Sequence, residues 1–258
     1  MLSRRSGLVL FIVATVLLFS SLFFISPIPQ PLAFHDFADK RSWLGIPNFG
    51  NVASNIPFAI FGVLGLLFLL GPKSANYFIH SRERIPWLFF FLGLFLTAFG
   101  SGYYHWNPSN ATLVWDRLPM TIAFTSLIAA FLSERVSQRG GLLALAPLLV
   151  LGVSSVVHWY MSEQRGHGDL RFYFSVQAYS FLLLLLFFFL LSASYSRSFD
   201  LAAAAGFYFV AMLLEHFDKQ VYSALGHVIS GHTLKHIAAS LSGYWILRML
   251  KLRRPLNA

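Results

Sequence analysis

The chain contains no cysteine and few charged residues, and both shortages exclude whole classes of protein. Without cysteine there are no disulfides, no thiolate metal sites and no cysteine nucleophile. Charged residues make up only 11% of the 258 residues, whereas an ordinary globular domain carries roughly a quarter. In their place the chain is 57% hydrophobic and 17% aromatic. This composition indicates a protein that lies in a lipid bilayer.

Apolar segments follow one another along the whole chain. A helix needs about 20 apolar residues to cross the hydrocarbon core of a membrane, and short stretches rich in Pro, Gly, Asn and Ser separate the segments. We therefore expect an all-α fold, a polytopic membrane helix bundle that forms one domain over residues 1–258. The eight predicted spans are 7–26, 52–71, 86–105, 114–132, 141–160, 172–193, 200–217 and 232–250.

Lysine and arginine are distributed unevenly between the two ends of these segments. With the N-terminus in the cytoplasm, twelve of the 19 Lys and Arg residues fall on the cytoplasmic side and seven on the other. Because cytoplasmic loops accumulate positive residues, we expect both termini to be cytoplasmic. The net charge of +9 is then a topology signal, and neither a nucleic acid nor a protein partner is indicated. We expect residues 1–30 to be a signal anchor or an extra span, because no clear cleavage site follows the apolar run.

This topology brings five polar side chains to one membrane depth. Ser101 and His105 end the third segment, Asp116 begins the fourth, and His232 and His236 begin the eighth. Residues four apart in a helix project from one face, and ionisable groups inside spans tend to mark functional sites. Three imidazoles beside a carboxylate are typical of catalytic zinc, which keeps one position for water. A histidine pair with this spacing also occurs in haem ligation and in proton relays.

Taken singly, the polar residues have simpler explanations. Asp116 is placed to cap a helix start, and Lys235 and Arg117 are expected to be interfacial cations that reach the headgroups. The chain has no G-x-S-x-G elbow, no P-loop and no H-E-x-x-H motif. Salt bridges and hydrogen bonds at the rim of the bundle are expected of the other charged residues near this end, Asp169, Arg171, Glu215, His216 and Asp218.

Several motifs resemble those of the alkaline ceramidases and of the wider group of seven-span membrane hydrolases that includes the adiponectin receptors. They are "NFGNVASNIPF" at 48–58, "SGYYHWNP" followed by "WDRLPM", and "HTLKH" in the last segment. The likeness covers residues 34–250 and leaves the first segment as an addition. It therefore implies a seven-span ceramidase-like core plus one extra N-terminal span.

The resemblance also implies a chemistry for the five polar residues. His105, His232 and His236 would bind zinc, Asp116 would hold the activated water as general base or proton shuttle, and Ser101 would orient the water or the carbonyl. The expected reaction is hydrolysis of the N-acyl amide bond of ceramide or a similar N-acyl membrane lipid. Because an activated water attacks amides and esters alike, a lipid esterase or lipase of the same superfamily is an alternative. A non-hydrolytic seven-span receptor or carrier is another.

An acidic calcium site ahead of the first family span is a further implication. The stretch "DFADKR" supplies Asp36 and Asp39, and Asn48 stands where the family has a later glutamate. Arg41, however, occupies the position of an asparagine ligand. Calcium requires several oxygen ligands with enough negative charge, so we expect a degenerate site. We hypothesise that Arg41 partly substitutes for the ion by pairing with Asp36 or Asp39.

Overall fold

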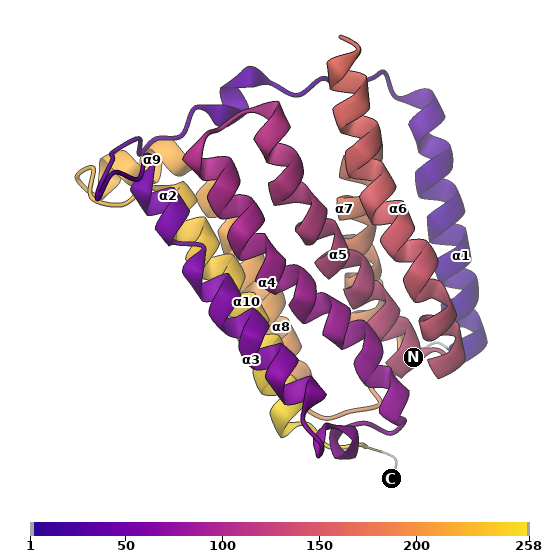
Figure 1. Ribbon diagram of the computed structural model, residues 1–258. Coiled ribbons are helices and arrows are strands. Elements are labelled where there is room, and N and C mark those ends of the chain that lie inside the picture. The colour runs from indigo at the N-terminus through magenta and orange to yellow at the C-terminus, as the bar shows by residue number, and fades with distance from the viewer. Residues whose placement is uncertain (1–2, 257–258) are drawn as a thin grey trace.

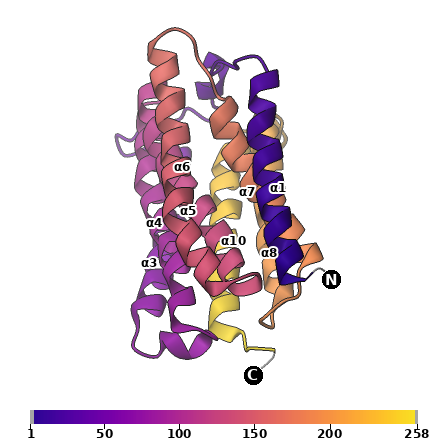
Figure 2. The same ribbon diagram turned by 90° about the vertical axis from the view of Figure 1, so that its right-hand side faces the viewer.

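The structure, a computed structural model, describes residues 3–256 and is helical, with no strand within that range. The helices run side by side as an elongated bundle (Figure 1), which is also visible from the side (Figure 2). The α-helices are α1 (Arg4–Ser21), α2 (Phe49–Ala53), α3 (Ile56–Leu70), α4 (Arg84–Trp106), α5 (Asn110–Arg135), α6 (Gln138–Gln164), α7 (Arg171–Leu190), α8 (Ser198–His216), α9 (Asp218–Ala224) and α10 (Gly231–Leu252). The all-α prediction is confirmed.

Seven stretches of the described chain are long and apolar enough to cross a membrane, so the protein is a candidate multi-pass membrane protein. Each of the eight predicted segments is helical, but α10 is not among the seven. It carries Lys235, Arg248 and Lys251, whose charges lower its mean hydropathy. A membrane crossing by α10 therefore stays a prediction.

The second predicted segment, 52–71, is two helices rather than one. The helix is interrupted at Ser54 and Asn55, which lie between α2 and α3. Pro57 lies in the first turn of α3, where a residue without an N–H group is tolerated, whereas inside a longer helix it would remove a hydrogen bond. At this interruption Ser54 contacts His236 of α10, whereas Asn55 faces the contact between α3 and α4.

Serine caps fix the start of two helices that carry the polar residues. Ser109 Oγ accepts the Thr112 N–H at 3.2 Å, and Thr112 Oγ1 accepts the Ser109 N–H at 3.0 Å, which forms a capping box at α5. At α10, Ser230 Oγ accepts the Thr233 N–H at 3.0 Å. Each cap satisfies a backbone donor that the first helical turn leaves unpaired.

The centre of the bundle is apolar. α4 packs against α3 and α5, α5 also packs against α6, and α8 packs against α10. Fully buried side chains fill the space between these helices, among them Trp87, Phe91, Ile128 and Leu183. α1 is an outer helix that packs on α7.

The two ends of the bundle differ in what they carry. α1 begins and α10 ends at one end, the lower end in Figure 1. The opposite end gathers α2, α9, the last turns of α4 and the first turns of α5 and α10. The predicted polar residues therefore lie at the end away from both termini. The cytoplasmic assignment of the termini stays a prediction.

Candidate metal centre

Three helix ends supply the five predicted side chains. The last turns of α4 carry Ser101 and His105, the second turn of α5 carries Asp116, and the first two turns of α10 carry His232 and His236. Because α4 runs toward this end and α5 and α10 run away from it, the side chains meet at one depth.

The three histidines form a compact, buried group. One ring nitrogen of each lies within 4.8 Å of the others, and His105 Nε2 and His232 Nε2 are 3.2 Å apart. Nitrogen atoms that bind one zinc ion tetrahedrally at roughly 2.0–2.1 Å lie about 3.3 Å from each other, so the separation of His105 Nε2 and His232 Nε2 fits two donors of a single ion. In the part of the chain that the structure describes, no carboxylate belongs to the group. The group could hold a metal ion and would leave a tetrahedral ion one open position.

Two of the histidines have partners that orient them. Ser54 Oγ lies 2.8 Å from His236 Nδ1, which leaves Nε2 as the free ring nitrogen of His236. The backbone N–H of His232 donates to Asp218 Oδ1 at 2.7 Å, so α9 holds the start of α10. A ring partner such as Ser54 fixes the tautomer and the direction of a metal-binding imidazole. The bond to Asp218 instead fixes the backbone that carries His232. Ser54 was not predicted from the sequence, and Asp218 was predicted only to form salt bridges or hydrogen bonds at the rim of the bundle.

Phe37 covers the histidine group from the segment between α1 and α2. Its ring centroid is 4.7 Å from that of His105 and 4.6 Å from that of His232, and the side chain is buried. The next residue is anchored as well, because the Ala38 N–H donates to Asp218 Oδ2 at 2.9 Å. A hydrophobic cover excludes water and lowers the dielectric constant around a site.

Asp116 and Ser101 lie together at the end of the bundle that carries the histidine group. The Ser101 hydroxyl donates to the Asp116 carboxylate, and the positive charges of Lys235 and Arg117 also act on that carboxylate. Ser101 is buried, whereas Asp116 is partly exposed. The carboxylate of Asp116 is therefore held by a neighbouring hydroxyl, which sets the direction that a proton-handling group needs.

A close approach of α4 and α5 determines the relative position of Ser101 and Asp116. A Cβ atom added at Gly100 would lie 1.9 Å from the backbone oxygen of Trp115, so only glycine permits the contact between α4 and α5. Gly100 directly precedes Ser101, and Trp115 directly precedes Asp116. The glycine contact therefore determines how near the serine and the carboxylate can come.

We expect Gly100→Ala to force α4 and α5 apart and to destabilise the protein by about 1–3 kcal/mol, the usual cost of overpacking. Thermal unfolding of the purified protein in detergent measures the effect. Gly102→Ala is the matched control, because a Cβ atom there meets open space. Equal unfolding temperatures for the two variants would contradict the assigned contact.

Lys235 differs from its prediction as an interfacial cation. Its Nζ lies 2.5 Å from Glu215 Oε1, and its side chain is only 18% exposed. α8 and α10 pack closely, so the lysine meets Glu215 before its side chain can reach outward. The prediction was wrong because it treated α10 without its neighbour.

Arg117 was also expected to reach the headgroups, and it is instead 4% exposed. Its guanidinium lies 4.1 Å from the ring centroid of Trp159 and 4.5 Å from that of Tyr173. Its Nη2 donates to Gln30 Oε1 at 2.7 Å. The arginine faces α6 and α7, where aromatic rings stabilise its charge.

The residues named for a calcium site have partners within the chain. Asp36 accepts hydrogen bonds from Lys40 at 2.5 Å and from Lys219 at 2.7 Å. These bonds, that from Lys219 above all, lower the pKa of Asp36 to about 2. The carboxylate is therefore ionised and paired at neutral pH.

Asp39 and Asn48 are engaged in the same way. The guanidinium of Arg41 donates to both carboxylate oxygens of Asp39 at 2.8 and 2.7 Å and lowers the pKa of that group. Arg41 also donates to the Val228 carbonyl at 2.6 Å, and Asn48 Nδ2 donates to the His105 carbonyl at 2.9 Å. The hypothesised pairing of Arg41 with Asp39 is thus observed, and a calcium site here stays a prediction.

We expect the purified protein to bind calcium no more tightly than about the 0.1–1 mM of weak calcium modules. The physical reason is that Asp36 and Asp39 are already neutralised by side-chain cations. Isothermal titration calorimetry measures the affinity. Arg41→Gln frees Asp39 and should increase the calcium affinity. Micromolar calcium binding by the unmodified protein would refute the expectation.

Fold and site together define a multi-pass membrane protein with a buried three-histidine group that could hold a metal ion. No protein-family model matches the chain, and no curated protein matches it either.

Proposed function

We propose that the protein is a zinc-dependent intramembrane amidohydrolase that cleaves the N-acyl amide bond of ceramide or a similar N-acyl lipid. The products would be a fatty acid and a lipid amine. One observation carries the proposal: three buried imidazoles have ring nitrogens within 4.8 Å of one another, at the same end of the bundle as the Asp116 carboxylate. The resemblance of the surrounding motifs to those of the alkaline ceramidases points the same way.

Zinc suits this donor set better than harder cations do, because all three donors are imidazole nitrogens and magnesium and calcium prefer oxygen. His105, His232 and His236 would hold the zinc, which would supply Lewis-acid chemistry for polarising a carbonyl group and for making water acidic enough to react near neutral pH. The three ligands leave room for one further group, as catalytic zinc sites do.

The other residues would move and hold protons. Asp116 would accept a proton from the attacking water and pass it to the nitrogen of the leaving amine. Ser101, whose hydroxyl donates to Asp116, would keep the carboxylate turned toward the reacting groups. Ser54 would hold the ring of His236 in place.

We propose that residues 34–250 form a seven-span core in which α10 is the last span, and that α1 is an additional span. The excess of Lys and Arg at the end that carries both termini supports a cytoplasmic location for them. The candidate metal centre would then face the non-cytoplasmic side. Substrate dissolved in the bilayer would reach it without leaving the membrane.

The test uses the purified full-length protein in detergent. Metal analysis should find about one zinc ion per chain, and an N-acyl lipid should release free fatty acid. Removing the metal with a chelator should abolish release, and adding zinc should restore it. A bound metal without hydrolysis of any amide or ester lipid would reject the proposal in favour of a receptor or carrier.

The same assay separates the amidase from the esterase. An N-acyl lipid and an ester lipid with the same acyl chain are compared at equal concentration. Faster cleavage of the amide supports the proposed reaction, because esters are intrinsically the easier substrates. Cleavage of the ester alone would assign the site to a lipase or esterase.

A further inference from the structure

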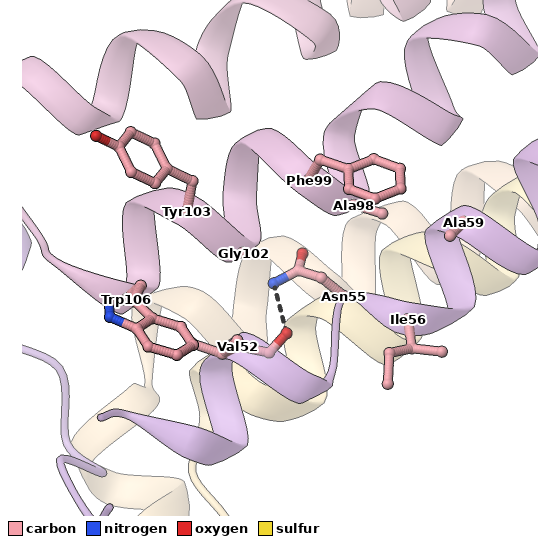
Figure 3. Close-up of a pocket in the computed structure, with 9 residues that line it drawn as sticks. All are labelled: Val52, Asn55, Ile56, Ala59, Ala98, Phe99, Gly102, Tyr103 and Trp106. Atoms are coloured by element: carbon pink, nitrogen blue, oxygen red, sulfur yellow. Dashed lines mark hydrogen bonds between the residues drawn. The ribbon is translucent and has the colours of Figure 1, made fainter. Parts of the chain in front are cut away.

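A groove lies on the outside of the bundle next to the candidate metal centre. Its volume is about 330 Å³, and it lies where α2 and α3 meet the last turns of α4 (Figure 3). Both walls belong to stretches that are long and apolar enough to span a membrane. The groove therefore opens toward acyl chains rather than toward water. Its central residues are Asn55, Ala59, Ala98, Phe99, Gly102 and Trp106.

Two neighbouring positions explain why the groove exists and where it leads. A Cβ atom at Gly102 would meet open space, so the missing side chain leaves the hollow open. Gly102 directly follows Ser101, and Asn55 directly follows Ser54. One residue of each pair faces the metal centre and the other faces the groove, so only the thickness of one helix layer separates the two.

Asn55 brings an unused acceptor to this groove. Its Nδ2 donates to the carbonyls of Asn51 at 2.8 Å and Val52 at 3.4 Å, the second of which is drawn in Figure 3. Its Oδ1 is buried and has no partner, although the residue is only 1% exposed. A buried polar atom without a partner destabilises the folded protein. Such a cost is recovered when a ligand brings a donor.

We propose that this groove binds an N-acyl lipid, with the acyl chain along Ala59, Ala98 and Phe99 and the amide N–H donated to Asn55 Oδ1. The lipid class rests on the proposed function, whereas binding itself does not require hydrolysis. Trp106 and Tyr103 are both exposed at the end of α4, and aromatic rings at the ends of membrane helices contact lipid headgroups. The groove thus holds a substrate in the bilayer, next to the centre that acts on it.

The probe is an N-acyl lipid with a photoreactive diazirine in its acyl chain, presented to the full-length protein in lipid nanodiscs. Mass spectrometry of the labelled protein should locate the label on α3 and α4 at the groove. An ester lipid with the same chain and diazirine lacks the N–H group. It should label these positions about tenfold less, as expected for one lost hydrogen bond to a buried acceptor.

Gly102→Leu fills the groove and should reduce labelling at least about tenfold. Gly206→Leu is the matched control, because Gly206 on α8 is exposed and an added Cβ atom would meet open space there, as at Gly102. Ala98→Leu narrows the groove from the same wall and serves as a second variant if Gly102→Leu folds poorly. The zinc content of each variant reports whether the bundle remains intact.

The outcomes separate the two proposals. Equal labelling of the unmodified protein and both groove variants, or equal labelling by the amide and the ester, overturns the groove assignment. Hydrolysis of N-acyl lipid without label in the groove does so as well, while the proposed function stands. Amide-selective label in the groove without hydrolysis keeps the groove and rejects the hydrolase.

Discussion

Replacing His232 with alanine is expected to remove the metal ion from the protein. The ring of His232 is about equally far from the other two, with centroids 4.8 and 4.9 Å away, and its Nε2 is 3.2 Å from His105 Nε2. Two imidazoles alone make a weak site. The loss of affinity should exceed the roughly 10–100-fold that removal of an outer-shell partner costs. Metal analysis after purification in a buffer with trace zinc measures it, and hydrolysis should disappear with the metal.

Two variants calibrate this result. His216→Ala removes an exposed histidine outside the group and should leave the metal content near one per chain. Ser54→Ala removes the partner of His236 Nδ1. Its zinc affinity should be intermediate between those of His216→Ala and His232→Ala, about 10–100-fold below that of the unmodified protein. Full zinc occupancy in His232→Ala would show that the three-histidine group is not the metal site.

Asp116→Ala is expected to abolish hydrolysis while the metal stays bound. Asp116 is not one of the grouped ligands, so its loss should leave the zinc content unchanged. As a proton acceptor and donor it contributes about 10²–10⁴-fold to the rate, and the fall should appear in kcat rather than in KM. Release of fatty acid under saturating substrate, together with metal analysis of the same sample, measures both quantities.

Asp36→Ala is the control for a carboxylate at the same end of the bundle. It takes part in exposed ion pairs, which contribute little to stability, so its activity should stay within about threefold of the unmodified protein. If Asp116→Ala loses zinc as well as activity, Asp116 is a ligand rather than a proton carrier. Unchanged activity would remove it from the mechanism.

The helices and the histidine pair could be predicted because their signals are local. Runs of about 20 apolar residues predict helices in a bilayer, and the spacing of His232 and His236 is a property of one helix. Asp116 needed the topology in addition, since only the order of the spans brings the start of α5 to the end of the bundle where α10 begins. The break before Pro57 had a local signal too, although the apolar run continued through it.

Other parts of the site had no local signal. Ser54 contacts His236, and Glu215 contacts Lys235, only because separate helices pack side by side in a particular register. Phe37 lies in a loop with no periodic pattern, so nothing in the sequence placed its ring on His105. Contacts between distant segments depend on packing, and a single sequence does not reveal them.

The position of Phe37 has a kinetic consequence. Its ring lies on the rings of both His105 and His232, and the adjoining backbone is tied to Asp218. An ion bound by the histidines could exchange with the surroundings on this side only when the segment detaches. The half-life of the loaded centre in a chelator would then report the opening rate of this segment, and it would be longer than the strength of three imidazole ligands alone suggests.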